Sequence, residues 1–86
     1  MSNSSPKHTP EQIASRADNQ ASFLDKLLDV LRLKNDAALS RKMGVQPPVI
    51  SKLRSGLIPF GASYIIIVHE LTGWSIKQIK ADLKVA

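Results

Sequence analysis

The sequence contains no cysteine and few aromatic residues, and both absences narrow what the chain can be. Without cysteine there is no disulfide framework and no thiolate metal site, which fits a reducing compartment such as the cytoplasm. Aromatic residues make up 5% of the chain, whereas binding of single-stranded nucleic acid needs a row of them. We therefore expect a cytoplasmic protein and find little support for single-strand binding.

Long hydrophobic runs are missing as well. The apolar run Tyr64 to Val68 is far too short to span a bilayer, and the first twenty residues are polar. We expect neither a membrane helix nor a secretory signal. The 86 residues suffice for one domain, and hydrophobic residues, 43% of the chain, are spread along it after residue 20. This composition predicts a folded domain.

The chain also lacks any arrangement of residues that is typical of catalysis. His8 and His69 have neither an i, i+4 partner nor a nearby carboxylate cluster, which a metal site needs. No glycine-rich phosphate loop is present, and Ser40, Ser51 and Ser55 have no base placed to activate them. We expect no enzyme activity, no catalytic residue, no cofactor and no metal.

Positive charge is present and unevenly distributed. The net charge is +5, and residues 32–54 carry six basic side chains against one acid, Asp36. The whole excess therefore lies in this segment, and the remainder of the chain is neutral. A neutral scaffold with one basic segment is typical of a polyanion binder, although basic residues can also merely solvate exposed helix faces.

The basic segment has the pattern of two short helices joined at Gly44. Asn35 can cap the first helix, and Gly44 can adopt the positive φ that ends it. Pro47 and Pro48 fit the first turn of a second helix, where backbone N–H groups lack partners anyway. The apolar residues expected to face one another are Ala38, Leu39 and Met43 in the first helix and Ile50 and Leu53 in the second.

These residues resemble a known family. Ser40, Gly44 four residues later and Ile50 six residues after that, followed by Ser51-Lys52-Leu53-Arg54-Ser55-Gly56, are similar to the helix-turn-helix of the lambda-repressor-like family of Cro and phage repressors. More loosely, the resemblance covers Phe23 to Leu83. It implies a bacterial or phage-type transcriptional regulator, a repressor by analogy, that binds double-stranded DNA as a homodimer. The operator would be pseudo-palindromic.

The resemblance also assigns contacts with DNA to the second helix, residues 46–55, and its surroundings. Base contacts carry over to Gln46, Pro47, Pro48, Ser51 and Lys52. Phosphate contacts are expected from charge, helix N-terminal amides and family position at Asn35, Arg41, Lys42, Arg54 and Ser55. Lys52 suits guanine and Gln46 suits adenine, whereas the prolines offer only apolar contact, for instance with a thymine methyl group.

The whole chain is predicted to be all-α, a compact bundle of about five helices. Residues 1–8 are expected to form a disordered tail and residues 9–86 a single domain. The capping-box pattern Thr9-Pro10-Glu11-Gln12 can begin an extra helix over 9–18, which the poor helical pair Asp18-Asn19 would weaken. A clearer amphipathic helix starts at Phe23.

Two later helices are expected. Ala62 to Thr72 contains residues with strand propensity, but Gly61 before it and Gly73 after it favour a helix. Because this helix is apolar nearly all round, it should be either the central core helix or part of a subunit interface. Ser75 to Gln78 forms a capping box for the last helix, whose inner residues are Ile76, Ile79 and Leu83.

Alternatives to a specific regulator remain open at this point. The same fold could be an antitoxin-like or adaptor module that engages a protein partner through the apolar helix 62–72 or the N-terminal helix. It could also be a weakly specific, nucleoid-type DNA binder. Dimer surfaces could form on helix 62–72, on the final helix, or on the helical region from Thr9 to Leu31.

Overall fold

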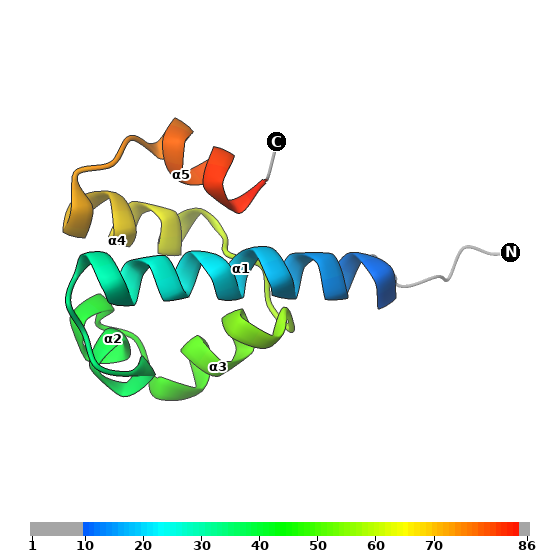
Figure 1. Cartoon of the computed structure of the whole chain (residues 1–86), viewed down its shortest axis with the longest axis horizontal. Coiled ribbons are helices and arrows are strands. Elements are labelled where there is room, and N and C mark those ends of the chain that lie inside the picture. The colour runs from blue at the N-terminus through cyan, green and yellow to red at the C-terminus, as the bar shows by residue number, and fades with distance from the viewer. Residues whose placement is uncertain (1–9, 85–86) are drawn as a thin grey trace, which may run out of the picture.

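The first helix, α1 (Pro10–Val30), runs through the middle of the molecule (Figure 1). The structure, a computed structural model, describes residues 10–84 of the chain. On one side of α1 lie α2 (Asp36–Met43) and α3 (Pro47–Ser55), and on the other lie α4 (Ala62–Thr72) and α5 (Ile76–Leu83). Both α3 and α5 pack on α1, while α2 packs on α3 and α4 packs on α5.

Residues 10–84 contain five helices and no strand, which confirms the all-α prediction. The predicted tail, residues 1–8, lies outside the described residues. One prediction about the helices is wrong: α1 continues through Asp18 and Asn19 as a single helix of 21 residues, and 9–18 is not a separate helix. The low helix propensity of this pair costs only about 0.7 kcal/mol per residue. Tertiary contacts of the neighbouring turns outweigh that cost.

The most extensive of these contacts is made by Gln20, whose side chain is 3% exposed. Its Nε2 group donates hydrogen bonds to the carbonyls of Leu53, at 2.6 Å, and Ile58, at 3.0 Å. Its Oε1 atom accepts a hydrogen bond of 2.9 Å from the N–H of Phe60. A single amide thus joins α1 to the end of α3 and to the connection between α3 and α4.

Apolar residues from all five helices form one core. Phe23 packs edge-on against Phe60 and Trp74, with ring centroids 5.4 and 6.2 Å apart. The buried apolar residues are Phe23, Leu24 and Leu27 from α1, Leu39 and Met43 from α2, Ile50 and Leu53 from α3, Phe60 from the connection, Ile65 and Val68 from α4, and Ile79 and Leu83 from α5. The predicted pairing of the inner faces of α2 and α3 is confirmed.

α4 is helical despite the strand propensity of its sequence. It buries Ile65 and Val68, but the side chain of Ile66 is 47% exposed on the opposite side. The central helix is therefore α1 and not α4, and the alternative of an interface on α4 remains a prediction. Gly73 ends the helix at a φ of 78°.

α5 begins as the sequence predicts, because Ser75 Oγ accepts a hydrogen bond of 3.0 Å from the N–H of Gln78. Ile79 and Leu83 are buried as expected. Ile76 is 41% exposed, so its predicted place in the inner stripe is wrong. Ile76 is the first residue of α5, and the buried residues of this helix are Ile79 and Leu83.

Replacement of Gln20 by leucine tests the role of its amide. Gln20→Leu preserves most of the volume but removes the partner of the Ile58 carbonyl and of the Phe60 N–H, and it removes one of the two donors to the Leu53 carbonyl. We therefore expect the free energy of unfolding to fall by about 2–4 kcal/mol. Gln78→Leu, at an exposed position on α5, should change it by no more than about 0.5 kcal/mol. Urea denaturation followed by circular dichroism measures both. Equal losses in the two variants would contradict the assigned role.

Candidate nucleic-acid interface

α2 begins and ends as the sequence predicts. Asn35 caps the helix, since its Oδ1 accepts a hydrogen bond of 2.9 Å from the N–H of Ala38. Gly44 has a φ of 73°, and the N–H of Val45 donates to the carbonyl of Ser40 at 3.0 Å. This left-handed glycine and its hydrogen bonds stop the helix and turn the chain toward α3.

α3 starts at Pro47 after an unusual cap. Gln46 occupies the cap position, but its side chain makes no capping hydrogen bond and is exposed. Pro47 and Pro48 fill the first turn, where their missing N–H groups cost nothing. Ile50 and Leu53 have no exposed surface, so they fix which face of α3 points inward.

The outward face of α3 is therefore open to solvent, together with most of the predicted contact residues. Nine of the ten are exposed: Asn35, Arg41, Lys42, Gln46, Pro47, Pro48, Ser51, Lys52 and Ser55. Arg41 and Lys42 lie in the last turn of α2, immediately before the turn that leads into α3. Exposure alone does not test a contact with DNA, and these assignments remain predictions.

Arg54 is the exception, because its guanidinium is engaged within the protein. Nε and Nη2 donate hydrogen bonds of 2.9 and 2.8 Å to the two carboxylate oxygens of Asp36. Nη1 donates a third, of 2.8 Å, to Asp25 on α1. The hydrogen bonds to Asp36 raise the pKa of Arg54 further above its usual range, although burial acts in the opposite direction. Asp25 adds to the rise.

This pairing changes the role that we assign to Arg54. The Arg54 side chain is 29% exposed and is bound to two carboxylates, so it joins α1, α2 and α3. A guanidinium held in this way is unsuited to bind a phosphate as well. We interpret Arg54 as a structural bridge and remove it from the candidate phosphate contacts.

The ion pair between Arg54 and Asp36 also leaves the other basic residues of segment 32–54 without an acidic partner in that segment. Asp36 is the only acid in residues 32–54, and its carboxylate is bound to Arg54. The five other basic side chains are exposed and form no ion pair with any residue in the described part of the chain: Arg32, Lys34, Arg41, Lys42 and Lys52. The α1–α2 loop, α2 and α3 therefore carry five positive charges that no ion pair in the described residues balances.

Two residues of α1 that no sequence motif indicates position the end of α3. Arg16 donates two hydrogen bonds to the carbonyl of Gly56, from Nε at 3.0 Å and from Nη2 at 2.6 Å. Gly56 follows the last turn of α3, next to the carbonyl of Leu53 that Gln20 binds. Arg16 and Gln20 continue the inner stripe of α1 by helical spacing, which was an available signal. Their acceptors are backbone atoms distant in sequence, which no local pattern indicates.

His69 and Trp74, which the sequence also brings to attention, make contacts within the protein. His69 Nδ1 lies 2.6 Å from the carbonyl oxygen of Trp74, and Lys26 Nζ lies 4.8 Å from the centre of the Trp74 ring. Both Trp74 and His69 thus serve the α4–α5 connection. Between residues 10 and 84 there is no group of three histidine or acidic residues that could hold a metal, and no helix is long and apolar enough to cross a membrane.

Substitution of Arg54 separates its structural role from a surface role. Arg54→Met should lower the free energy of unfolding by about 1–3 kcal/mol, because two carboxylates lose their partner. Lys52→Met, on the exposed face of the same helix, should change it by no more than about 0.5 kcal/mol. Of the partners, Asp36→Asn should cost more than Asp25→Asn, since the Asp36 side chain is 38% exposed and that of Asp25 is 67% exposed. Denaturation with guanidinium chloride ranks the four variants by their free energy of unfolding. The reverse ranking would contradict the role of Arg54 as a structural bridge.

Comparison of the chain with protein-family models, with curated protein sequences and with solved structures finds no match. The all-α fold, the open face of α3 and the charge around it are therefore the observations from which a function can be argued.

Proposed function

We propose that the chain is a double-stranded DNA-binding transcriptional regulator in which α2 and α3 act as a helix-turn-helix and α3 enters the major groove. The observation that carries this proposal is that all basic residues of segment 32–54 except Arg54 lack an acidic partner within residues 10–84. Five exposed cations without an acidic partner in the described residues lie in the α1–α2 loop, in α2 and in α3, whose outer face is open. Such a surface attracts a polyanion, and the rest of the chain carries no excess charge to compete.

The shape of the outer face of α3 supports insertion into a groove. Pro48, Ser51 and Ser55 are short or compact, and Lys52 is the one long side chain among them. The major groove is about 12 Å wide, so a helix must bring its backbone close to the bases before its side chains can reach them. Short side chains allow that approach.

Individual roles follow from the chemistry of each group. Lys52 donates to guanine, and the exposed amide of Gln46, which is not used for capping, pairs with adenine. Arg41 and Lys42 bind phosphates at the edge of the groove. Asn35 uses Oδ1 for its cap, and its Nδ2 group is the atom that would donate to a phosphate.

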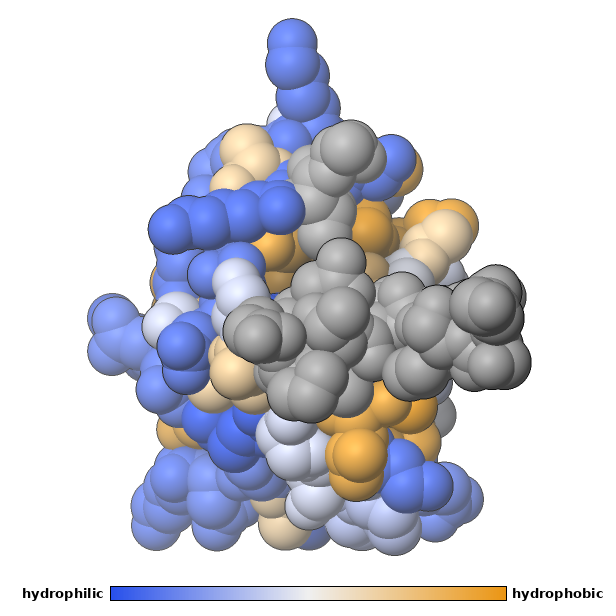
Figure 2. All heavy atoms as spheres, turned by 90° about the vertical axis from the view of Figure 1, so that its right-hand side faces the viewer, coloured by the Kyte–Doolittle hydropathy of each residue, from blue (hydrophilic) through white to orange (hydrophobic). Residues whose placement is uncertain are grey.

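Homodimerisation on a pseudo-palindromic operator is part of this proposal and rests on the family resemblance. The exposed large apolar residues are distributed over several elements, namely Val30, Leu57, Ile66 and Ile76. On the one face that Figure 2 shows, orange apolar surface is visible in more than one place. No single face is therefore preferred as the dimer surface.

A second candidate, a weakly specific DNA binder, is favoured by Pro47 and Pro48. Both are exposed in the first turn of α3, where a base reader needs hydrogen-bonding groups, and proline side chains have none. Binding-site selection from random duplexes distinguishes the candidates. A palindromic consensus supports an operator-binding regulator, whereas enrichment without a consensus supports the weakly specific binder.

Affinity for duplex DNA should fall steeply with salt. Three to five phosphates neutralised per chain give a slope of log affinity against log salt between about −2.7 and −4.5. Fluorescence anisotropy with a labelled mixed-sequence duplex, at salt concentrations between about 50 and 200 mM, measures the slope. A slope near zero, or no binding at the lowest salt, would contradict the proposal.

The two kinds of contact predict different mutant behaviour. Lys52→Ala should alter the preference among duplex sequences, because it removes a contact with a base edge worth about 1–3 kcal/mol of discrimination. Arg41→Ala should weaken binding to all sequences by a similar factor. Competition among duplexes that differ at single base pairs measures both effects. The opposite pattern would mean that the base-reading and phosphate-binding roles are exchanged.

A further inference from the structure

Two residues after the end of α1, the chain adopts an uncommon backbone conformation. Arg32 has a φ of 56°, its N–H donates to the carbonyl of Asp29 at 3.2 Å, and the N–H of Leu33 donates to that of Leu28 at 2.8 Å. This is the arrangement in which glycine normally follows a helix. Three other helices of this protein use glycine at the corresponding position, with φ between 73° and 78°. An arginine there destabilises the folded chain relative to glycine.

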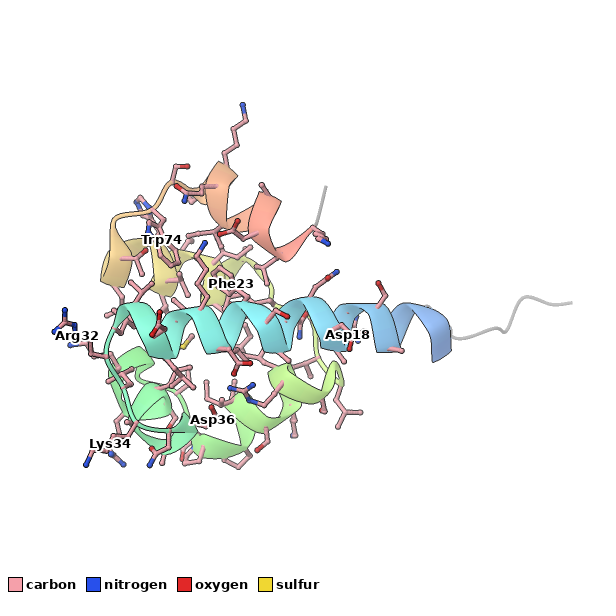
Figure 3. The ribbon with its side chains drawn as sticks, viewed as in Figure 1. Asp18, Phe23, Arg32, Lys34, Asp36 and Trp74 are labelled. Atoms are coloured by element: carbon pink, nitrogen blue, oxygen red, sulfur yellow. The ribbon has the colours of Figure 1, made fainter. Side chains whose placement is uncertain are left out.

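Packing does not explain the presence of arginine at this position. The Arg32 side chain is exposed and makes no hydrogen bond or ion pair with the described residues. Figure 3 shows it pointing away from the helices, at the end of the molecule where α1 passes into α2. A cation near the C-terminus of α1 gains from the helix dipole, but that gain does not require the left-handed position.

The surroundings of Arg32 indicate a role in the basic surface. Lys34, two residues later, is also exposed and points outward from the same loop (Figure 3). The loop leads directly to Asn35, the cap of α2. Arg32 and Lys34 border a shallow depression that also contains Asp25 and Asp29. The depression thus contains two acids and two cations. Asp25 is bound to Arg54, whereas Arg32 and Lys34 form no ion pair with the described residues.

We propose that Arg32, together with Lys34, forms an additional phosphate contact, so that the α1–α2 loop binds the DNA backbone beside the groove entered by α3. This inference rests on the proposed DNA-binding function. The left-handed conformation at Arg32 directs the chain into the loop and presents the guanidinium to solvent. The positive φ at Arg32 destabilises the folded chain, and the Arg32 side chain adds a positive charge next to α2.

Lys84 provides a matched control for this contact. It is the other non-glycine residue with positive φ in the described chain, at 58°, and it also follows a helix, α5. It is exposed and cationic like Arg32, but it lies at the end of α5, on the side of α1 opposite to α2 and α3 (Figure 1). Replacement of either residue by glycine removes one charge and one unfavourable φ.

The experiment compares Arg32→Gly and Lys84→Gly in the full chain by thermal unfolding and by anisotropy with a mixed-sequence duplex. Both variants should unfold at a temperature higher by roughly 2–6 °C. Arg32→Gly alone should lose affinity, roughly three- to tenfold, and its salt slope should become shallower by about 0.9. Lys84→Gly should bind within about twofold of the unmodified chain.

Each other outcome has a distinct meaning. If the unmodified chain binds the duplex and the two glycine variants bind equally well, the loop contact is wrong and the proposed function is unaffected. If Arg32→Gly does not raise the unfolding temperature, Arg32 is not held at a cost and the inference is overturned. If the unmodified chain does not bind duplex DNA at low salt, the proposed function itself fails.

Discussion

The ion pair between Arg54 and Asp36 is the interaction on which both the fold and the candidate surface depend. Two parallel hydrogen bonds fix α3 relative to α2, and a third, to Asp25, fixes both relative to α1. The same pair balances the charge of the only acid of residues 32–54, whose side chain stays 38% exposed. Structural neutralisation of one basic residue thus leaves the other five as an unbalanced group. Because Asp36 stands in the first turn of α2, its carboxylate also lies where the helix dipole favours a negative charge.

Hydrogen bonds with α1 fix the position of α3, which apolar packing alone does not fix. Burial of Ile50 and Leu53 selects the inner face of α3, but apolar contacts are non-directional and tolerate small rotations and shifts of a short helix. Hydrogen bonds from Gln20 and Arg16 to the carbonyls at the end of α3 have defined directions and lengths. They fix the position of the helix that we propose to enter the groove. A long central helix is therefore needed as much for its two polar residues as for its leucines.

Local chemistry made part of the structure predictable. Caps and helix ends follow from single residues, and Asn35, Gly44 and Ser75 act as the sequence indicates. The inner faces of α2 and α3 follow from helical spacing. The continuity of α1 could not be predicted, because the weak pair Asp18-Asn19 is held by contacts with residues more than thirty positions away. For the same reason the sequence places Arg54 among the expected phosphate contacts: its partner Asp25 lies 29 positions earlier in the chain, and Asp36 lies 18 positions earlier. Sequence spacing does not reveal which cations are already paired.

The hydrogen bonds of Gln20 have a consequence for how the candidate surface forms and opens. They join residues 33, 38 and 40 positions apart, so they can form only after a long stretch of chain has closed on α1. A nine-residue helix such as α3 is too short to be stable alone, and its last turn is held by these distant partners. The end of α3 therefore belongs to the cooperative unit that unfolds with the whole domain, and its amide hydrogens should exchange with solvent mainly by global opening. The surface that we propose to contact DNA should therefore resist local opening as strongly as the core beneath it.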